Sequence, residues 1–509
     1  MEFKTRSTKS LANIATSFLN KIITLVMKFA VRTVFIYTLN QEYLGLNGLF
    51  SSIMSLLSLA DLGFGIALPF SLYKPLAKND IKKIQTIMNF YAKVYTIVGI
   101  AVLVIGVSLI PFLPFIIKEM ANIGYIKFIY LLFVINSAVS YFFIYKRTLI
   151  VADQRGYIVT FIESGFSLLL ALIQIVVLLI FKNYILYLTS GIFITILQNI
   201  YISNKCNKLY PYITKNGNDL KLEPNEIKKF TKNIFALFIY KLAIVIETGI
   251  DNIIISFFIG ITSVGLYSNY LLIIDSLKSI LMITFNSLTA SIGNIAASEK
   301  SEKAYLIYKA INLLSIILYG ISAIAIWILI NPFINIWAGK DYLLDFLVVL
   351  FLCINYYIFG SQNTTSLFRN SYGLFWEGRY RPFIMTISNI LFSIFFVNYI
   401  GLAGVFLGTI VSRLLSVGII DPYILHKYAF KLPVIPYYLE KIRYGVIVLV
   451  VGVFTKWVTS FIHIDNLLMW LIKGIIVCIV STTAFLVIFW RKEEFKYIVR
   501  LINSINQRR

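Results

Sequence analysis

Runs of about 18 or more apolar residues recur along the whole chain, and short segments rich in charge separate them. Each run is long enough to cross a hydrocarbon layer of roughly 30 Å as a helix. The pattern predicts an all-α integral membrane protein with about fourteen transmembrane helices. The apolar run at 11–39 is too long for a signal peptide, so we expect the first helix to be retained. The spans are expected near residues 11–37, 44–72, 84–110, 125–147, 157–181, 184–202, 233–259, 266–292, 306–331, 343–366, 383–400, 402–424, 444–462 and 467–490.

The distribution of Lys and Arg predicts the orientation of these helices. An even number of spans places both termini on one side. The segments expected on that side hold 33 of the 46 Lys and Arg, whereas the segments expected on the other side hold four. Such a bias marks the first side, and with it both termini, as cytoplasmic. The net charge of +23 is therefore a topology signal, and we expect no nucleic-acid partner.

The composition excludes several classes of function. With 59% hydrophobic and 14% charged residues, against roughly a quarter charged in soluble proteins, this is not a soluble domain. Its cysteines and histidines lack ligand spacing, so we expect no metal site and no catalytic triad. The chain has no G-x-x-x-x-G-K-[ST] phosphate loop, so we expect no ATPase and no cofactor. The residues concerned are Cys206, Cys353, Cys478, His426 and His463.

A weak internal repeat divides the chain into two similar halves. An offset of 220 residues places Lys21 on Lys241 and the turn Leu44-Gly45-Leu46 on Val264-Gly265-Leu266. Helices 1 and 7 both begin on the cytoplasmic side, so the pattern predicts two parallel six-helix lobes plus two C-terminal helices. Parallel repeats of this kind are typical of transporters, whose substrate site lies between the halves. The expected divisions are an N-terminal lobe at 1–210, a basic cytoplasmic linker at 211–232, a C-terminal lobe at 233–430, and two additional helices with a basic cytoplasmic tail at 431–509.

Three stretches carry a resemblance to a known family: 42–50 (EYLGLNGLF) running into 60–63 (ADLG), 378–382 (GRYRP) and 404–409 (GVFLGT). Over roughly residues 10–430 the chain resembles the polysaccharide-transporter (O-antigen-flippase-like) branch of the multidrug/oligosaccharidyl-lipid/polysaccharide flippase superfamily. The resemblance implies a V-shaped, two-lobed transporter of the bacterial plasma membrane, not an enzyme. It also implies the substrate, undecaprenyl-pyrophosphate-linked oligosaccharide repeat units, which alternating access moves from the cytoplasmic to the outer leaflet for surface polysaccharide biosynthesis.

The resemblance further implies contact with the lipid bilayer, a glycan polymerase and other assembly proteins. Because the chain has no nucleotide site, the drive must be a proton or sodium gradient, the membrane potential, or removal of the product outside.

The first helix carries a stripe of cations without an acid. Lys21, Lys28 and Arg32 fall within an arc of about 100° on this helix. An ionisable group at the bilayer centre costs about 2.5–3.5 kcal/mol and normally faces a cavity or a partner. We expect this stripe to bind the pyrophosphate, with Lys241 facing Lys21 at the cytoplasmic mouth.

Other intramembrane charges have two interpretations. Lys278 and Arg413 are further candidates for substrate binding, whereas Asp61, Glu247, Asp251 and Asp275 are candidates for ion coupling or charge pairing, with Glu247 predicted to pair with Lys278. Charges nearer the helix ends are expected to pair between neighbouring helices, and three further lysines are expected to extend to the membrane interface. The first group is Glu163, Lys93 and Asp421, and the second is Lys127, Lys456 and Lys473.

Three alternative functions remain open. A multidrug cation antiporter of the same superfamily would need an anionic cavity, and the excess of intramembrane Lys and Arg argues against it. A lipid II flippase would be expected to carry arginines on several N-terminal helices, but here Arg32 lies on helix 1 and helix 2 has no basic residue. A membrane glycan polymerase would display paired carboxylates outside, where the pattern shows only scattered acids such as Glu119, Asp341 and Asp345.

Overall fold

The computed structural model describes residues 22–61, 64–118, 125–213, 249–298 and 301–506. Helices dominate these ranges, which contain no β-strand. The chain forms two compact units, Met1–Gly265 (unit 1) and Leu266–Arg509 (unit 2). The predicted linker at 211–232 and the first helix up to Lys21 lie largely outside the described residues.

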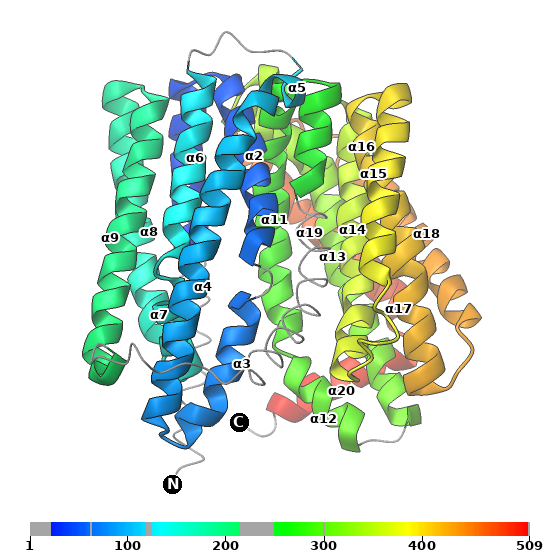
Figure 1. Cartoon of the computed structure of the whole chain (residues 1–509). Helices are drawn as coiled ribbons and strands as arrows, with labels where there is room; N and C mark the ends of the chain where they lie inside the picture. The colour runs from blue at the N-terminus through cyan, green and yellow to red at the C-terminus, as the bar shows by residue number, and fades with distance from the viewer. Residues whose placement is uncertain (1–21, 62–63, 119–124, 214–248, 299–300, 507–509) are drawn as a thin grey trace. The chain divides into compact units, whose positions relative to one another are not determined.

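Unit 1 is a bundle of long helices joined by short turns. In Figure 1, α4, α6, α8 and α9 run roughly alongside one another, and α4 packs on α6, α6 on α9 and α8 on α9. The first helix is described over 22–38, and a short apolar helix covers Gly249–Phe258. The other elements are α2 (Gln41–Leu57), η1 (Ser58–Asp61), α3 (Phe64–Ala77), α4 (Ile81–Ser108), η2 (Ile110–Phe112), α5 (Leu113–Ile116), α6 (Ile126–Tyr141), α7 (Ile144–Ala152), α8 (Gly156–Phe181), α9 (Tyr184–Leu209) and η3 (Pro211–Ile213).

Unit 2 is built around the 37-residue helix α13, which packs on α14, α18, α19 and α20. The helix that begins with α16 contains two π-helical segments, η5 and η6, on either side of α17. The elements are α11 (Ile261–Asn286, which begins in unit 1), α12 (Thr289–Ser298), α13 (Ser301–Trp337), η4 (Lys340–Tyr342), α14 (Phe346–Ser371), α15 (Arg381–Ile400), α16 (Leu402–Arg413), η5 (Leu414–Gly418), α17 (Ile419–Ile424), η6 (Leu425–Phe430), α18 (Ile435–Val458), α19 (Leu467–Phe489) and α20 (Glu493–Asn506).

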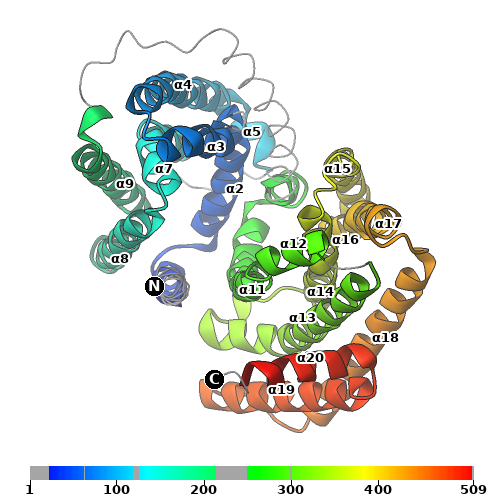
Figure 2. The ribbon, with the colours of Figure 1, turned by 90° about the horizontal axis from the view of Figure 1, so that it is seen from below.

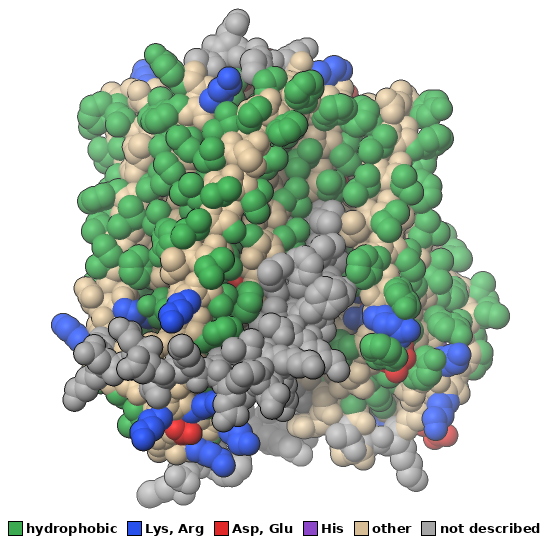
Figure 3. All heavy atoms as spheres, viewed as in Figure 1, with side chains coloured by type: hydrophobic (Ala, Val, Ile, Leu, Met, Phe, Trp, Pro, Cys, Tyr) green, Lys and Arg blue, Asp and Glu red, His purple; other side chains and the backbone are tan. Residues whose placement is uncertain are grey.

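Within the described residues, each of the fourteen predicted spans falls mainly on helix. Among the described residues, ten helices are long and apolar enough to cross a membrane, and the pair α6–α7, bent by 43°, makes an eleventh. The three other predicted spans correspond to helix 22–38, to Gly249–Phe258 and to α18, which carries four charged residues. On the face seen in Figure 3, apolar side chains cover the middle of each unit, and most of the visible Lys and Arg lie below them.

The second predicted span is not one continuous helix. A single helix was expected over 44–72, but α2 ends at Leu57, a 3₁₀ turn follows over Ser58–Asp61, and α3 begins at Phe64. The expectation of an unbroken helix is therefore wrong. Apolar composition continues across the turn, so hydropathy alone gives no sign of the break.

The last helix, α20, connects the ends of α13 and α18. Lys309 of α13 lies 2.8 Å from Glu494 of α20, and Lys492, just before α20, lies 3.1 Å from Glu440 of α18. Lys492 also donates a hydrogen bond of 2.6 Å to the Tyr444 hydroxyl. Figure 2 shows α20 beside α13 and α19. The two ion pairs thus fasten the amino ends of α13 and α18 to one short helix.

Gly360 allows α14 to pack closely on α13. A Cβ atom at this position would lie 1.9 Å from the Tyr319 ring of α13, and Ser315 donates a 2.8 Å hydrogen bond to the Gly360 carbonyl. We expect Gly360→Ala to lower stability by roughly 1–3 kcal/mol, because the core must shift to admit the methyl group. The melting temperature of the purified protein measures this loss.

The matched control is Gly293→Ala on α12, where nothing lies within 4 Å of an added Cβ. That variant is expected to melt at the same temperature or higher, because alanine favours helix over glycine by about 1 kcal/mol. Equal melting temperatures for the wild-type protein and Gly360→Ala would contradict the packing argument.

Candidate functional site

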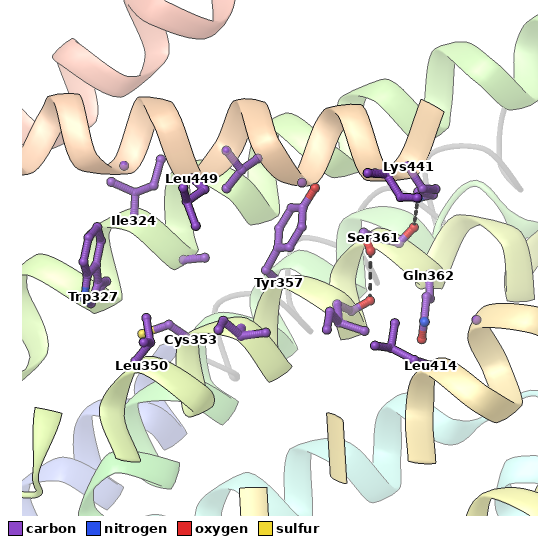
Figure 4. A pocket seen from close by; sticks show the side chains of 18 of the residues that line it. Ile324, Trp327, Leu350, Cys353, Tyr357, Ser361, Gln362, Leu414, Lys441 and Leu449 are labelled. Carbon is purple, nitrogen blue, oxygen red and sulfur yellow. Dashed lines mark hydrogen bonds between the residues drawn. The ribbon is translucent and has the colours of Figure 1, made fainter. Parts of the chain in front are cut away.

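A long apolar groove lies within unit 2, between α13, α14, η5 and α18. Its volume is about 790 Å³. Its walls are mainly aliphatic and aromatic side chains, because each of the four elements turns an apolar stripe toward it (Figure 4). The residues that shape the walls include Ile324, Trp327, Leu350, Cys353, Tyr357, Leu414, Ile419, Leu449 and Val453.

The groove runs along most of α18. Tyr437 and Val453 both line it, and α18 rises about 24 Å between these residues at about 1.5 Å per residue. The hydrocarbon layer is roughly 30 Å thick. The groove is therefore long enough to follow an extended apolar chain through most of the membrane.

Packing behind the groove holds its walls. Leu313, Ile316 and Ile324 of α13 form a buried core with Val448 of α18 and Phe485 of α19. Ile324 and Val448 also line the groove, so this buried core forms the wall where α13 meets α18, the rear wall. The wall opposite is η5, a π-helical turn, and such turns occur frequently at functional sites.

Polar groups gather at one end of the groove. The Lys441 ammonium donates to Asn312 Oδ1 at 2.9 Å and to the Ser361 carbonyl (Figure 4). An ammonium has three N–H donors, and no described acceptor takes the third. The Gln362 Oε1 atom nearby is buried and has no hydrogen-bond partner in the described part of the chain. This end can therefore supply further hydrogen bonds to a bound group.

Gly418 makes room for this polar end. A Cβ atom at Gly418 would lie 3.0 Å from Nε2 of Gln362, so the amide passes close over the backbone of η5. A larger residue would push Gln362 away from the groove.

A buried ionic cluster lies at the cytoplasmic end predicted for unit 2. Asp421 of α17 pairs with Arg369 of α14 at 2.6 Å and with Arg381 of α15 at 3.0 Å. Its second oxygen also accepts from Ser366 at 2.6 Å. Gly378 is needed here, since an added Cβ would lie 2.8 Å from the Arg369 guanidinium. Two residues of the 378–382 stretch that carries the family resemblance therefore have a structural role.

The predicted pairing of charges near helix ends is confirmed for two of three residues. Asp421 binds two arginines, as described above, and Glu163 lies 2.8 Å from Arg147. Lys93 on α4 has an exposed side chain and forms no ion pair within the described residues.

Two predicted substrate-binding cations come together in unit 2. Lys278 Nζ lies 3.8 Å from the centre of the Phe359 ring, and Arg413 Cζ lies 5.2 Å from the same centre. They approach from α11 and α16, while Phe359 belongs to α14. The ring face stabilises both cations. Their predicted role in binding substrate stays a prediction.

The predicted cation stripe on the first helix is only partly described. Lys21, Lys241 and Glu247 lie outside the described residues, and so does the predicted Glu247–Lys278 pair. Lys28 has an exposed side chain on helix 22–38. Arg32, one turn further on, is half-buried beside Tyr184 and Tyr187 of α9, whose rings stack on each other.

The predicted ion-coupling acids lie in different surroundings. Asp61 is buried in the 3₁₀ turn that breaks the second span, close to Tyr91, Tyr95 and Tyr141. Asp251 is half-buried on helix Gly249–Phe258, and Asp275 is exposed on α11. Throughout the ranges that the structure describes, no three His, Cys, Asp or Glu residues are grouped as metal ligands would be.

Lys441 is a candidate site residue that the sequence pattern does not indicate. The span was expected to begin at 444, so Lys441 was counted among the cytoplasmic topology charges. In the structure α18 begins at Ile435, with Pro436 in its first turn. Proline in the first turn of a helix is a known start signal, and it could have placed Lys441 inside the helix.

Comparison with known proteins identifies the fold. No family model and no curated protein sequence matches the chain. Among solved structures, the lipid II flippase MurJ in an inward closed conformation matches with a TM-score of 0.65 and 16% identity, covering 93% of this chain and 98% of its own. An inward-facing multidrug resistance MATE family transporter of the MOP superfamily matches with a TM-score of 0.63 and 15% identity. This match covers 80% of this chain and 94% of the transporter. An outward-facing MATE family transporter matches with a TM-score of 0.55 and 13% identity. This match covers 81% of this chain and 94% of the transporter.

These likenesses show an all-α, multi-pass membrane fold shared with transporters of the MOP superfamily. The last three helices, Ile435–Asn506, make up 72 of the 509 residues, or about 14%. An alignment over 93% of the chain leaves only 7% outside and must include part of this segment. The MurJ likeness therefore extends into the segment that these last three helices form.

The buried cluster yields a stability prediction. Asp421→Asn is expected to destabilise the protein by about 3–5 kcal/mol, because it leaves two buried guanidinium groups without their carboxylate. The measurement is thermal unfolding in detergent. Glu163→Gln is the matched control, since its pair with Arg147 is partly exposed and is worth about 1 kcal/mol or less. Similar losses in the two variants would show that burial does not set the strength of the cluster.

Proposed function

We propose that this protein is a flippase that moves polyprenyl-pyrophosphate-linked oligosaccharide repeat units from the cytoplasmic to the outer leaflet. The observation that supports it most is the apolar groove in unit 2 with a cation at one end. A polyprenyl diphosphate is complementary to this groove, because it has a long apolar tail and an anionic group at one end. The shared fold with transporters of the MOP superfamily agrees with this function.

The groove selects its ligand mainly at the polar end. Lipid tails are as apolar as the groove walls, so transfer of a polyprenyl chain from lipid into the groove gains little hydrophobic free energy. The diphosphate, in contrast, can accept the remaining N–H of Lys441, and a charge-assisted hydrogen bond of this kind is about twice as strong as a neutral one. The groove therefore aligns the tail, and Lys441 recognises the anion.

The distribution of basic residues supports the direction of transport. Lys441 lies at the end of unit 2 that also carries Arg369, Arg381 and Lys427, which is the side predicted to be cytoplasmic. Lipid-linked precursors would then enter the groove from the inner leaflet. Lys28, Arg32, Lys278 and Arg413 are the proposed further contacts of the head group.

A multidrug cation antiporter is the second candidate, because solved MATE transporters share the fold. The groove argues against it. An organic cation would meet the ammonium of Lys441, and the groove lining contains no carboxylate. Like charges in a region of low dielectric repel strongly. The anionic substrate is therefore the better supported of the two.

Neutralising Lys441 should abolish glycan export. Lys441→Gln is expected to reduce export at least about tenfold, because one charge-assisted contact to the diphosphate is lost. Surface glycan is measured in cells that depend on this protein, alongside protein level and melting temperature. Lys427→Gln, at an exposed position at the same end of unit 2, is the control and should export normally. Normal export by Lys441→Gln, or failure explained by unfolding, would refute the proposed role.

The first helix gives a second test. Lys28→Gln and Arg32→Gln should abolish export while protein level and membrane insertion stay normal, because the proposed contacts to the pyrophosphate are lost. A structural role predicts lower melting temperatures instead. Parallel measurement of export and melting decides between the two roles.

A further inference from the structure

A second, smaller cavity lies at the end of the groove opposite Lys441. It has a volume of about 270 Å³ and is bounded by α13, α14, α18 and α19. It shares Trp327 and Phe346 with the groove, so the two spaces adjoin. The sequence predicts that Lys456 and Lys473 extend separately to the membrane interface, but the structure places both on the wall of this one cavity.

The two ammonium groups are held without a carboxylate. Lys456 Nζ lies 4.7 Å from the centre of the Trp327 ring and 5.4 Å from that of Phe346. Lys473 donates to the Ile462 carbonyl at 2.9 Å. Neither forms an ion pair with any described acid. Both therefore keep N–H donors for a bound anion, and the lining contains no Asp or Glu that would repel it.

Two other polar side chains of the cavity wall already form hydrogen bonds. Asn331 accepts from the Tyr270 hydroxyl at 2.6 Å and donates to the Leu344 carbonyl at 3.2 Å. The Thr459 hydroxyl donates to the Thr455 carbonyl at 2.8 Å. These bonds stabilise the walls. The two lysines keep N–H donors that are not engaged, and Trp327, which also lines the cavity, has a buried Nε1 without a hydrogen-bond partner among the described residues.

The position of the cavity relates it to the groove. From Lys441 to Lys456, α18 rises about 22 Å at about 1.5 Å per residue. The apolar groove thus has a cationic group near each end, and the two ends lie at the predicted inner and outer membrane surfaces. If these lysines only anchored their helices at the membrane surfaces, no apolar groove would be needed between them.

We propose that the cavity of Lys456 and Lys473 binds the phosphate or diphosphate of a polyprenyl lipid at the outer leaflet. This inference rests on the proposed function. The tail would lie in the same groove, and the phosphate end would lie at Lys456 and Lys473 instead of at Lys441. Lysine suits the task, because a flexible point charge can follow a phosphate and release it. Two partly exposed ammonium groups give a moderate affinity, as a release site requires.

Phosphate in this cavity could also come from a free ion or from an anionic glycerophospholipid. The adjoining groove favours the polyprenyl lipid, because a single long chain fits a narrow path along α18 and a free ion would make no use of it. The experiment below separates the three sources.

The test is photocrosslinking with the full-length protein in nanodiscs of phosphatidylcholine. The probe is a polyprenyl diphosphate with a photoreactive group next to the phosphate, and mass spectrometry locates the crosslinked peptides. Two sites are expected, one around Lys441 and one within 456–473. The Lys456→Gln/Lys473→Gln variant should lose the second at least about tenfold and keep the first. Lys456→Arg/Lys473→Arg should retain both.

Controls and competitors decide among the outcomes. Lys340→Gln, an exposed lysine at the same end of unit 2, should crosslink like the wild-type protein. Unlabelled polyprenyl phosphate should compete, whereas inorganic phosphate and phosphatidylglycerol should not. Equal competition by either of the latter would overturn the assignment to a polyprenyl lipid. Crosslinking at Lys441 alone, or a second site unaffected by the double variant, would overturn this inference and leave the proposed function standing. Absence of both sites would contradict the proposed function itself.

Discussion

A lysine or arginine on a helix inside the hydrocarbon layer costs about 2.5–3.5 kcal/mol unless it finds a partner or water. This cost governs where the cations of this chain lie. Asp421, which is fully buried, compensates the buried Arg369 and the partly buried Arg381. The Phe359 ring stabilises Lys278 and Arg413. Lys441 donates to two neutral oxygens instead, so its charge is solvated without being neutralised.

That difference separates structural charges from candidate functional ones. A cation paired with a carboxylate presents little net charge to a ligand, whereas one without a carboxylate partner presents more. Lys441 and Lys473 donate to carbonyl or amide oxygens, Lys456 lies over aromatic rings, and all three line cavities in unit 2. An anionic substrate would supply the counter-charge that the protein itself does not provide at these positions.

The sequence predicts the helices of this protein better than its site. Apolar runs locate the helices of the described residues, because the length of a hydrocarbon-crossing helix is fixed by the bilayer. The pairing of Asp421 and Glu163 is also predictable from their places near helix ends. The 3₁₀ break at Ser58–Asp61 and the π-helical turns of η5 and η6 are not, since they change backbone geometry without changing hydropathy. Lys441 was missed because α18 begins nine residues before its apolar run does.

The ion pair between Lys309 and Glu494 determines how the attachment of the short helix α20 to α13 depends on pH. Burial raises the pKa of Glu494, but hydrogen bonds from Lys309 and the backbone, with the charges of Lys309 and Lys492, outweigh it and lower that pKa. A lowered carboxyl pKa means that the stabilising pair is complete above the ordinary value for Glu and is lost only in stronger acid. Near neutral pH the attachment of α20 to α13 is therefore constant. The part of the groove wall that α13 provides is thus held in the same way throughout the pH range in which Glu494 stays ionised.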